Sequence, residues 1–152
     1  MTPTFSIARQ TPTTDDYARI IEAVGWRPRR PEAIEIALRN SCFSVCAVSD
    51  GTVVGFGRVI GDGGIHLYVT DIVVLPEFQR HGIGTAIVAA LTRWVDEFPF
   101  PNTIVAVLPT PGLVSFYERH GYKVQPSHSP AMSRWINAKW PNTALEPTPT
   151  AP

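Results

Sequence analysis

The segment Gln79-Arg80-His81-Gly82-Ile83-Gly84 decides the fold of this chain. It lies between an apolar, strand-like run over 71–75 and a long amphipathic stretch that begins at Gly82. The first amides of a helix lack intrahelical partners and lie at the positive end of the helix dipole, so they bind anions. Glycines let the backbone approach such an anion closely. The segment therefore predicts a strand, a pyrophosphate-binding loop and a helix, and with them a nucleotide-type cofactor.

The spacing of this loop separates three kinds of nucleotide-binding site. A dinucleotide-binding fold requires Gly-x-Gly-x-x-Gly, but the third glycine position holds Ile87. An ATP-binding P-loop requires Gly-Lys followed by Ser or Thr, whereas this chain has Gly84-Thr85-Ala86. What remains is Gln/Arg-x-x-Gly-x-Gly/Ala, which resembles the coenzyme A signature of the GNAT superfamily of N-acetyltransferases. A strand-to-helix turn that binds no ligand is the alternative interpretation.

Apolar periodicity and turn residues predict the remaining elements. Alternating or continuous apolar runs indicate strands, a recurrence at three and four residues indicates helices, and Asp50-Gly51 indicates a hairpin turn. The predicted strands are 5–9, 43–49, 52–60, 65–74, 103–108, 122–125 and 132–136, and the predicted helices are 13–24, 31–40, 82–98 and 112–120. This order resembles the small, bacterial-type single-domain members of the GNAT superfamily over residues 5–136. The resemblance implies an α/β (α+β) acyl-CoA N-acyltransferase fold, with a mixed, mostly antiparallel sheet of six to seven strands flanked by about four helices.

Composition limits the class of protein. A chain of 152 residues that is 44% hydrophobic suits one domain, expected over residues 1–139, and the Pro- and Thr-rich residues 140–152 predict a flexible tail. The net charge of zero gives no electrostatic footprint for nucleic acid or for an anionic membrane surface. No apolar stretch approaches the roughly 20 residues that span a bilayer, so a cytoplasmic protein is expected. Cys42 and Cys46 are expected to be buried thiols, and no metal site is expected.

The resemblance implies how acetyl-CoA would be held. In this superfamily the strand before the loop and the strand after its helix splay apart, and the pantetheine arm inserts between them. Backbone groups of the first strand would contact that arm, and one N–H near Val73 or Val74 would stabilise the developing oxyanion. The glycine loop would hold the pyrophosphate. The residues that match these cofactor-binding positions are Ile72, Val73, Val74, Gln79, Arg80, His81, Gly82, Ile83, Gly84 and Thr85.

A second motif, Phe116-Tyr117-Glu118-Arg119-His120-Gly121-Tyr122, resembles the F-Y-E-x-x-G-F/Y segment of the same superfamily. In relatives the tyrosine that matches Tyr117 points at the CoA sulfur. A phenol with a pKa near 10 is protonated at neutral pH and can give its proton to a leaving thiolate. The resemblance therefore implies that Tyr117 is the general acid.

The sequence is less decisive about the general base. Many relatives carry Glu or His on the strand face that matches Tyr68 and Thr70, and neither residue is a good base. Asp71 is the nearest carboxylate, but strict alternation places it on the opposite face unless a β-bulge re-aims it. A buried aspartate bonded to backbone amides, or deprotonation of the amine through water, are the alternatives. His66 shares the Tyr68 face, and His120 closes a helix whose C-terminal dipole favours a cation.

The acceptor side is expected to form from the first two helices and their loop, with Trp26, Phe56, Tyr68 and Thr70 as substrate-binding residues. Aromatic walls and a neutral chain favour a small primary amine with an apolar or aryl part. The predicted function is acetyl transfer from acetyl-CoA to such an amine by direct attack in a ternary complex. The alternatives are an acetyltransferase that acts on a protein amine and a non-catalytic acyl-CoA-binding module. Thr110 stands near where relatives place a cofactor-binding asparagine, and a homodimer is expected by analogy.

Overall fold

The computed structural model describes residues 3–129 and 131. The chain divides into two compact units, the first of which ends at Leu108, while the second begins at Pro109. The loop that is expected to bind the cofactor lies in the first unit, and Tyr117 lies in the second. The prediction of a single domain over residues 1–139 stays a prediction.

The first unit is built on a five-stranded mixed sheet. Its strands lie in the order in which they occur in the sequence, and all neighbours are antiparallel except the last pair, which is parallel. Asp50 and Gly51 have φ of +48° and +76°, as expected for the hairpin turn that joins the second and third strands. The strands are β1 (Ser6–Ala8), β2 (Phe43–Ser49), β3 (Thr52–Gly61), β4 (His66–Val74) and β5 (Ile104–Val107).

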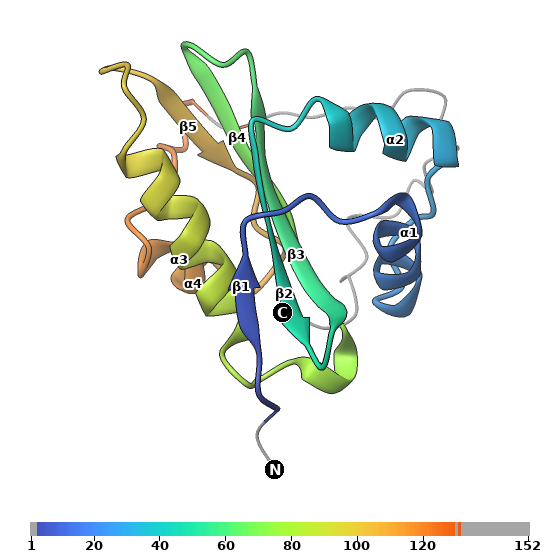
Figure 1. The fold of residues 1–152 in the computed structure, drawn as a ribbon. Helices are drawn as coiled ribbons and strands as arrows, with labels where there is room; N and C mark the ends of the chain where they lie inside the picture. Colours follow the sequence, from blue (N-terminus) through green and yellow to red (C-terminus); the bar gives the residue numbers. More distant parts are fainter. Residues whose placement is uncertain (1–2, 130, 132–152) are drawn as a thin grey trace, which may run out of the picture. The chain divides into compact units, whose positions relative to one another are not determined.

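Three helices cover the two faces of this sheet. Figure 1 shows α3 (Ile83–Asp96) on one face and both α1 (Thr14–Ala23) and α2 (Pro31–Arg39) on the other. On β3, Gly57 lies under α3, because a Cβ atom there would come within 2.6 Å of Ile87 and 2.9 Å of Leu91. Residues of β3 on the opposite face, such as Phe56 and Arg58, therefore point toward α1 and α2.

The second unit contains a short helix that carries the Phe-Tyr motif. Helix α4 (Val114–Glu118) is shorter than the predicted 112–120, and Gly121 follows it with a φ of +87°. The Tyr122 amide donates to the Tyr117 carbonyl at 3.3 Å, and the rings of these two tyrosines meet edge to face, with their centroids 6.0 Å apart. The motif thus folds back on itself at a left-handed glycine, as its sequence predicts.

The strand count differs from the prediction. The described residues contain five strands rather than six to seven. The prediction of a strand over 122–125 is wrong, because these residues are irregular, and the predicted strand over 132–136 lies outside the described residues. Near Tyr122 the chain is still completing the turn after α4, so its β-branched and aromatic residues do not enter a ladder.

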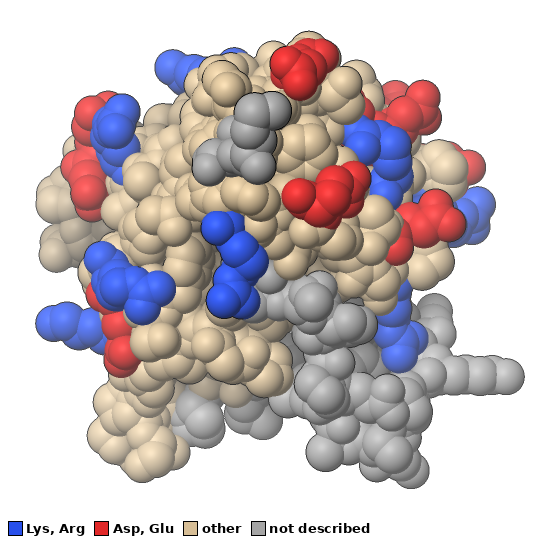
Figure 2. Space-filling model, turned by 90° about the horizontal axis from the view of Figure 1, so that it is seen from below, with Lys and Arg blue, Asp and Glu red and all other residues tan. Residues whose placement is uncertain are grey.

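Two surface properties bear on the kind of ligand. Among the described residues, no helix combines the length and the apolar character needed to cross a membrane. On the face shown in Figure 2, basic and acidic side chains are interspersed among uncharged residues. That face therefore presents no broad field of one sign.

Candidate active site

The loop between β4 and α3 forms a backbone cradle. After a single 3-10 turn, η1 (Pro76–Phe78), Arg80 and Gly82 have φ of +65° and +81°, and Gly82 serves as the N-cap of α3 without any side-chain cap. The first intrahelical bond at this end runs from the Ala86 amide to the Gly82 carbonyl. The amides of Ile83, Gly84 and Thr85 are thus the open donors of the helix. A cradle of this kind fits a pyrophosphate.

The strand that leads into the cradle has an open edge. The parallel pairing of β4 with β5 runs from His66–Ile104 to Val69–Val107 and ends there. From Thr70 to Val74, β4 pairs with β3 on one side, and among residues 3–129 and 131 no strand pairs with its other side. The Gln79 side chain donates to the Val74 carbonyl at 2.9 Å and ties the cradle to the end of this strand. An extended ligand arm can add to this edge as a further strand.

A β-bulge interrupts β4 beside this open edge. Thr70 pairs with Arg58 and Val73 pairs with Phe56, so Asp71 and Ile72 together oppose Gly57. Asp71 adopts a left-handed conformation with a φ of +52°. Ile72 lies beneath α3, within 3.3 Å of the Cβ position of Gly57, whereas Asp71 turns toward Tyr17 and Arg58. The bulge expected from the resemblance is therefore present, and it moves Asp71 to the face of the sheet that carries α1 and α2.

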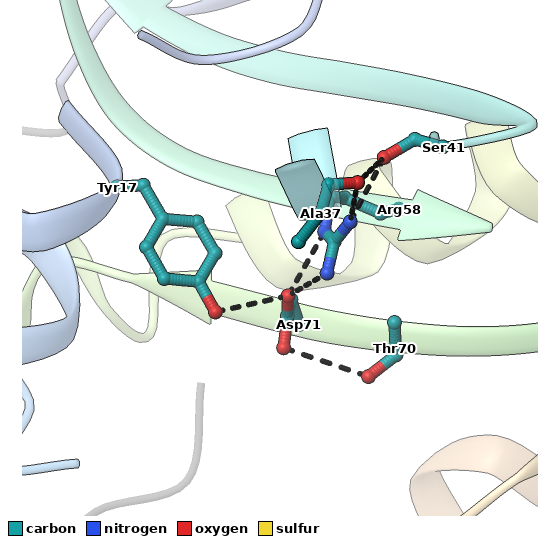
Figure 3. A network of polar contacts seen from close by, with 6 residues as sticks. All are labelled: Tyr17, Ala37, Ser41, Arg58, Thr70 and Asp71. Atoms are coloured by element: carbon teal, nitrogen blue, oxygen red, sulfur yellow. Dashed lines mark hydrogen bonds and ion pairs between the residues drawn. The ribbon is translucent and has the colours of Figure 1, made fainter. Parts of the chain in front are cut away.

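On that face Asp71 is part of a polar network (Figure 3). Its Oδ2 atom accepts hydrogen bonds from Arg58 Nε at 2.9 Å, Arg58 Nη2 at 2.6 Å and the Tyr17 hydroxyl at 3.2 Å. Its Oδ1 atom lies 3.5 Å from the Thr70 hydroxyl, which makes a weak contact at best. The interpretation of Asp71 as a carboxylate bonded to backbone amides is wrong, because side chains supply the donors. Its assignment as the general base stays a prediction, which these contacts disfavour.

Burial and charge keep the tyrosines of this face neutral. Burial raises the pKa of Tyr17 to about 12, and the nearby Asp71 carboxylate adds to the shift. Burial also raises the pKa of the Tyr68 phenol, with a smaller contribution from Asp71 and an opposing one from a backbone hydrogen bond with Leu108. Both hydroxyls are therefore protonated at neutral pH, and the Tyr17 hydroxyl donates to Asp71.

The predicted acceptor-side residues occupy different environments. Tyr68 and Thr70 are half-buried and share one face of β4, and Trp26 is half-buried just after α1. Phe56 has none of its surface exposed and packs on Tyr17, with their ring centroids 5.1 Å apart. The structure therefore places Phe56 in the core, where its ring contacts Tyr17. The role of Phe56 as a wall stays a prediction that its burial disfavours.

The two histidines considered as bases lie in other settings. His66 is exposed at the start of β4, where its Nδ1 atom is 3.6 Å from an Asp62 carboxylate oxygen in the preceding turn. Burial, aided by repulsion from Arg119, lowers the pKa of His120. The expectation that a helix dipole favours a cationic His120 is wrong, because α4 has five residues and ends at Glu118.

The two cysteines and Thr110 lie in different settings. Burial raises the pKa of Cys46 to about 11, and its Sγ atom lies 3.5 Å from the Gln10 carbonyl oxygen. Cys46 is wholly buried as predicted, whereas Cys42 is half-buried. Thr110 lies in the loop before α4, where its carbonyl accepts a hydrogen bond from the Leu113 amide. Cys46 is therefore protonated at neutral pH and is not a thiolate nucleophile.

Sequence reasoning missed Tyr17 and Arg58. The signal for Arg58 is its place in β3, where apolar and glycine residues surround an arginine that is 5% exposed. A buried arginine needs an anionic partner, and Asp71 is the carboxylate of the adjacent strand. Tyr17 carries a weaker signal, because a tyrosine on an amphipathic helix commonly packs in the core.

Comparisons with known proteins give this geometry a context. The family model described as Acetyltransferase (GNAT) family matches residues 9–122. An uncharacterized N-acetyltransferase, ycf52, from Pyropia yezoensis is 27% identical over 115 residues, which cover 73% of this chain and 65% of the relative. Serotonin N-acetyltransferase 2, chloroplastic, from Oryza sativa subsp. japonica is 29% identical over 128 residues, which cover 80% of this chain and 63% of the relative. The chain thus spans less than two thirds of the length of these curated relatives.

One solved structure shares the fold over its whole length. The crystal structure of a probable acetyltransferase of unknown function from methicillin-resistant Staphylococcus aureus superposes with a TM-score of 0.80 at 26% identity. The match covers 88% of this chain and 100% of that protein.

Proposed function

Because this chain belongs to the GNAT acetyltransferase family, we propose that it transfers the acetyl group of acetyl-CoA to a primary amine by direct attack. The observation that carries the proposal is the continuity of two backbone features. The open edge of β4 from Thr70 to Val74 leads directly into the cradle that begins at Gln79. An extended arm that ends in a pyrophosphate matches this pair of features better than an isolated phosphate does.

The residues present fit the cofactor. The uncapped amides at the start of α3, together with the exposed Arg80 guanidinium, would hold the pyrophosphate. Backbone groups of Ile72, Val73 and Val74 would hold the pantetheine arm, and an amide near Val73 or Val74 would donate to the developing oxyanion. The bound thioester supplies the activated acetyl group.

Tyr117 is proposed as the general acid. The support is its place in the motif, since a tyrosine hydroxyl with the ordinary pKa near 10 can give a proton to a departing thiolate. Its burial within a turn closed by Gly121 fixes the direction of the ring. The proposal for this residue rests on the sequence resemblance.

The amine is proposed to lose its proton to water rather than to a dedicated side chain. Asp71 Oδ2 already accepts three hydrogen bonds, and His66 is an exposed residue at the far end of β4. The tyrosines of the same face are neutral phenols and are poor bases. A hydrogen-bonded water beside Thr70 would connect the amine to solvent.

The proposed acceptor is a small primary amine with an apolar or aryl part. The half-buried aromatic residues Trp26 and Tyr68 support this choice, as does the similarity to a relative that is named for serotonin. The cytoplasmic location and the homodimer stay predictions, and the name of the rice relative points to a chloroplast for that protein.

The test is a turnover assay with acetyl-CoA and serotonin, with a lysine-containing peptide as the comparison acceptor. We expect release of free CoA thiol that depends on serotonin and exceeds the rate with the peptide. Saturable CoA binding without turnover over a broad amine panel would favour the non-catalytic module, and faster acetylation of the peptide would favour a protein acceptor.

A further inference from the structure

The left-handed residue in β4 is an aspartate rather than a glycine. A non-glycine residue at positive φ is uncommon, and it persists where surrounding contacts hold it, although Asp and Asn tolerate this region better than other residues. Asp71, with a φ of +52°, is the first residue of the bulge, and Ile72 to Val74 follow it directly. Whatever holds Asp71 therefore also sets the direction of the backbone groups that the proposed function assigns to the cofactor and the oxyanion.

Arg58 is the main group that holds Asp71. Its guanidinium donates through Nε and Nη2 to Asp71 Oδ2, and its Nη1 atom donates to the Ala37 carbonyl at 2.9 Å and to the Ser41 hydroxyl at 2.8 Å (Figure 3). The planar guanidinium fixes the angle between these partners, which a single ammonium group does not. Arg58 thus links the bulge to the C-terminal end of α2 and to the residues that follow it.

Tyr17 connects helix α1 to the same carboxylate. Its hydroxyl donates to Asp71 Oδ2 at 3.2 Å, and the Arg58 guanidinium lies over its ring, 6.0 Å from the centroid. The two helices on the acceptor face and the bulge in β4 are consequently joined at one carboxylate oxygen. These three elements all belong to the first unit.

We propose that Arg58 is a positioning residue for acetyl transfer, and that it acts through Asp71 to hold the β4 bulge and the acceptor-side helices in one arrangement. This inference rests on the proposed function. It assigns Asp71 a place in an ion pair that orients backbone groups, rather than the place of a proton acceptor. Displacement of a reacting group by about 1 Å can lower a rate about 100-fold, so a loosened bulge is expected to lower kcat.

A double-mutant cycle tests this role. The four proteins are the parent, Arg58→Met, Asp71→Asn and the double variant, which leaves no buried charge without a partner. Asparagine tolerates the left-handed conformation, so Asp71→Asn removes the charge while it keeps the backbone preference. Arg19→Met is the matched control, because the partners of Arg19, the Asp16 carboxylate and the Val53 carbonyl, lie in α1 and at the start of β3 rather than in the bulge.

Turnover, its pH profile and CoA affinity are measured for each protein. We expect kcat to fall about 10- to 100-fold in each single variant and no further in the double variant, because both substitutions break the same link. The pH profile keeps its limbs, CoA affinity falls less than kcat because the cradle still holds the pyrophosphate, Arg19→Met matches the parent, and Arg58→Lys lies between Arg58→Met and the parent.

Hydrogen exchange at the amides of Ile72, Val73 and Val74 gives a readout that does not need turnover. We expect faster exchange in both single variants and no change in Arg19→Met. An inactive parent would refute the proposed function, and exchange would still decide whether Arg58 holds the bulge. Parent-like kcat and parent-like exchange in Arg58→Met would overturn the positioning role. A double variant whose loss of kcat equals the product of the two single losses would overturn it as well. Loss of a pH limb in Asp71→Asn alone would identify Asp71 as the base.

Discussion

The cradle at 79–85 and the Tyr17–Arg58–Asp71 network are built on different principles. The cradle consists of backbone amides within one short segment, and two positive-φ residues shape it. The network joins side chains from α1, β3 and β4 that are far apart in the sequence. The cradle therefore depends on residues that permit a left-handed backbone conformation. The network depends instead on contacts between side chains that the fold brings together.

The largest expected effect is a loss of protein stability when the network is broken. Arg58→Met leaves the Asp71 carboxylate, whose side chain is 17% exposed, without its cationic partner. We expect the free energy of unfolding to fall by about 3–5 kcal/mol, as is usual when one partner of a buried ion pair is removed. Chemical denaturation measures this loss. Arg19→Met removes an exposed pair with Asp16 and one hydrogen bond to the Val53 carbonyl, and a smaller loss of about 1–2 kcal/mol is expected. Similar losses in the two variants would show that the network is no stronger than a surface pair.

The cradle is tested by Gly82→Asp. The new carboxylate would stand at the helix N-terminus where an anion is expected. A Cβ atom at Gly82 would have nothing within 4 Å, so the main effects of the substitution are charge and backbone strain. We expect CoA affinity to fall about 100-fold or more, since like charges repel in a partly dehydrated site. Isothermal titration with CoA measures the loss.

Gly63→Asp is the matched control for this substitution. Gly63 has a φ of +73° and equally open space in the turn before β4, so the same residue change brings the same strain without entering the cradle. Its CoA affinity is expected to equal that of the parent. Equal losses of CoA affinity in the two variants would contradict the proposal that this loop binds the pyrophosphate.

The pH dependence of stability reports on Tyr17. Its pKa is raised in the folded protein from 10 to about 12, so the folded state keeps a proton that the unfolded state loses. This contribution is fully present below pH 10 and is lost as the pH rises from 10 to 12, by about 3 kcal/mol for a pKa difference of about two. Tyr17→Phe should therefore flatten the alkaline fall in the free energy of unfolding. An unchanged slope would show that burial and the Asp71 carboxylate do not raise the pKa of Tyr17 in the folded protein.

The smallest expected effect concerns chemistry rather than structure. Tyr117→Phe removes a phenol hydroxyl and keeps the ring that meets Phe116 and Tyr122 edge to face. Turnover should fall about tenfold or more, as expected for the loss of a general acid, while CoA affinity stays similar. Steady-state kinetics with acetyl-CoA and serotonin measures this. Tyr122→Phe is the matched control, and an equal loss in both variants would refute the role of Tyr117.

The sequence predicted the local features and missed the dispersed ones. The cradle, the Asp50-Gly51 hairpin and the left-handed Gly121 each follow from residues that are close in the sequence and have strong backbone preferences. The bulge at Asp71 was expected only from the family resemblance, because alternation by itself places Asp71 on the other face. Arg58 and Tyr17 were missed because their roles depend on strand register and on helix packing. The residue type of Phe56 predicts a wall of the acceptor site, whereas packing against Tyr17 places this residue in the core.

The central claim is that CoA binds along the open edge of β4 and ends in the cradle. An NMR titration of the isotope-labelled protein with CoA tests it most directly, because each backbone amide reports its own contact. We predict saturable shifts at Ile72, Val73 and Val74 together with Ile83, Gly84 and Thr85, and no such shifts in Gly82→Asp at the same CoA concentration. Saturable binding that leaves these six amides unshifted in the parent would contradict the claim.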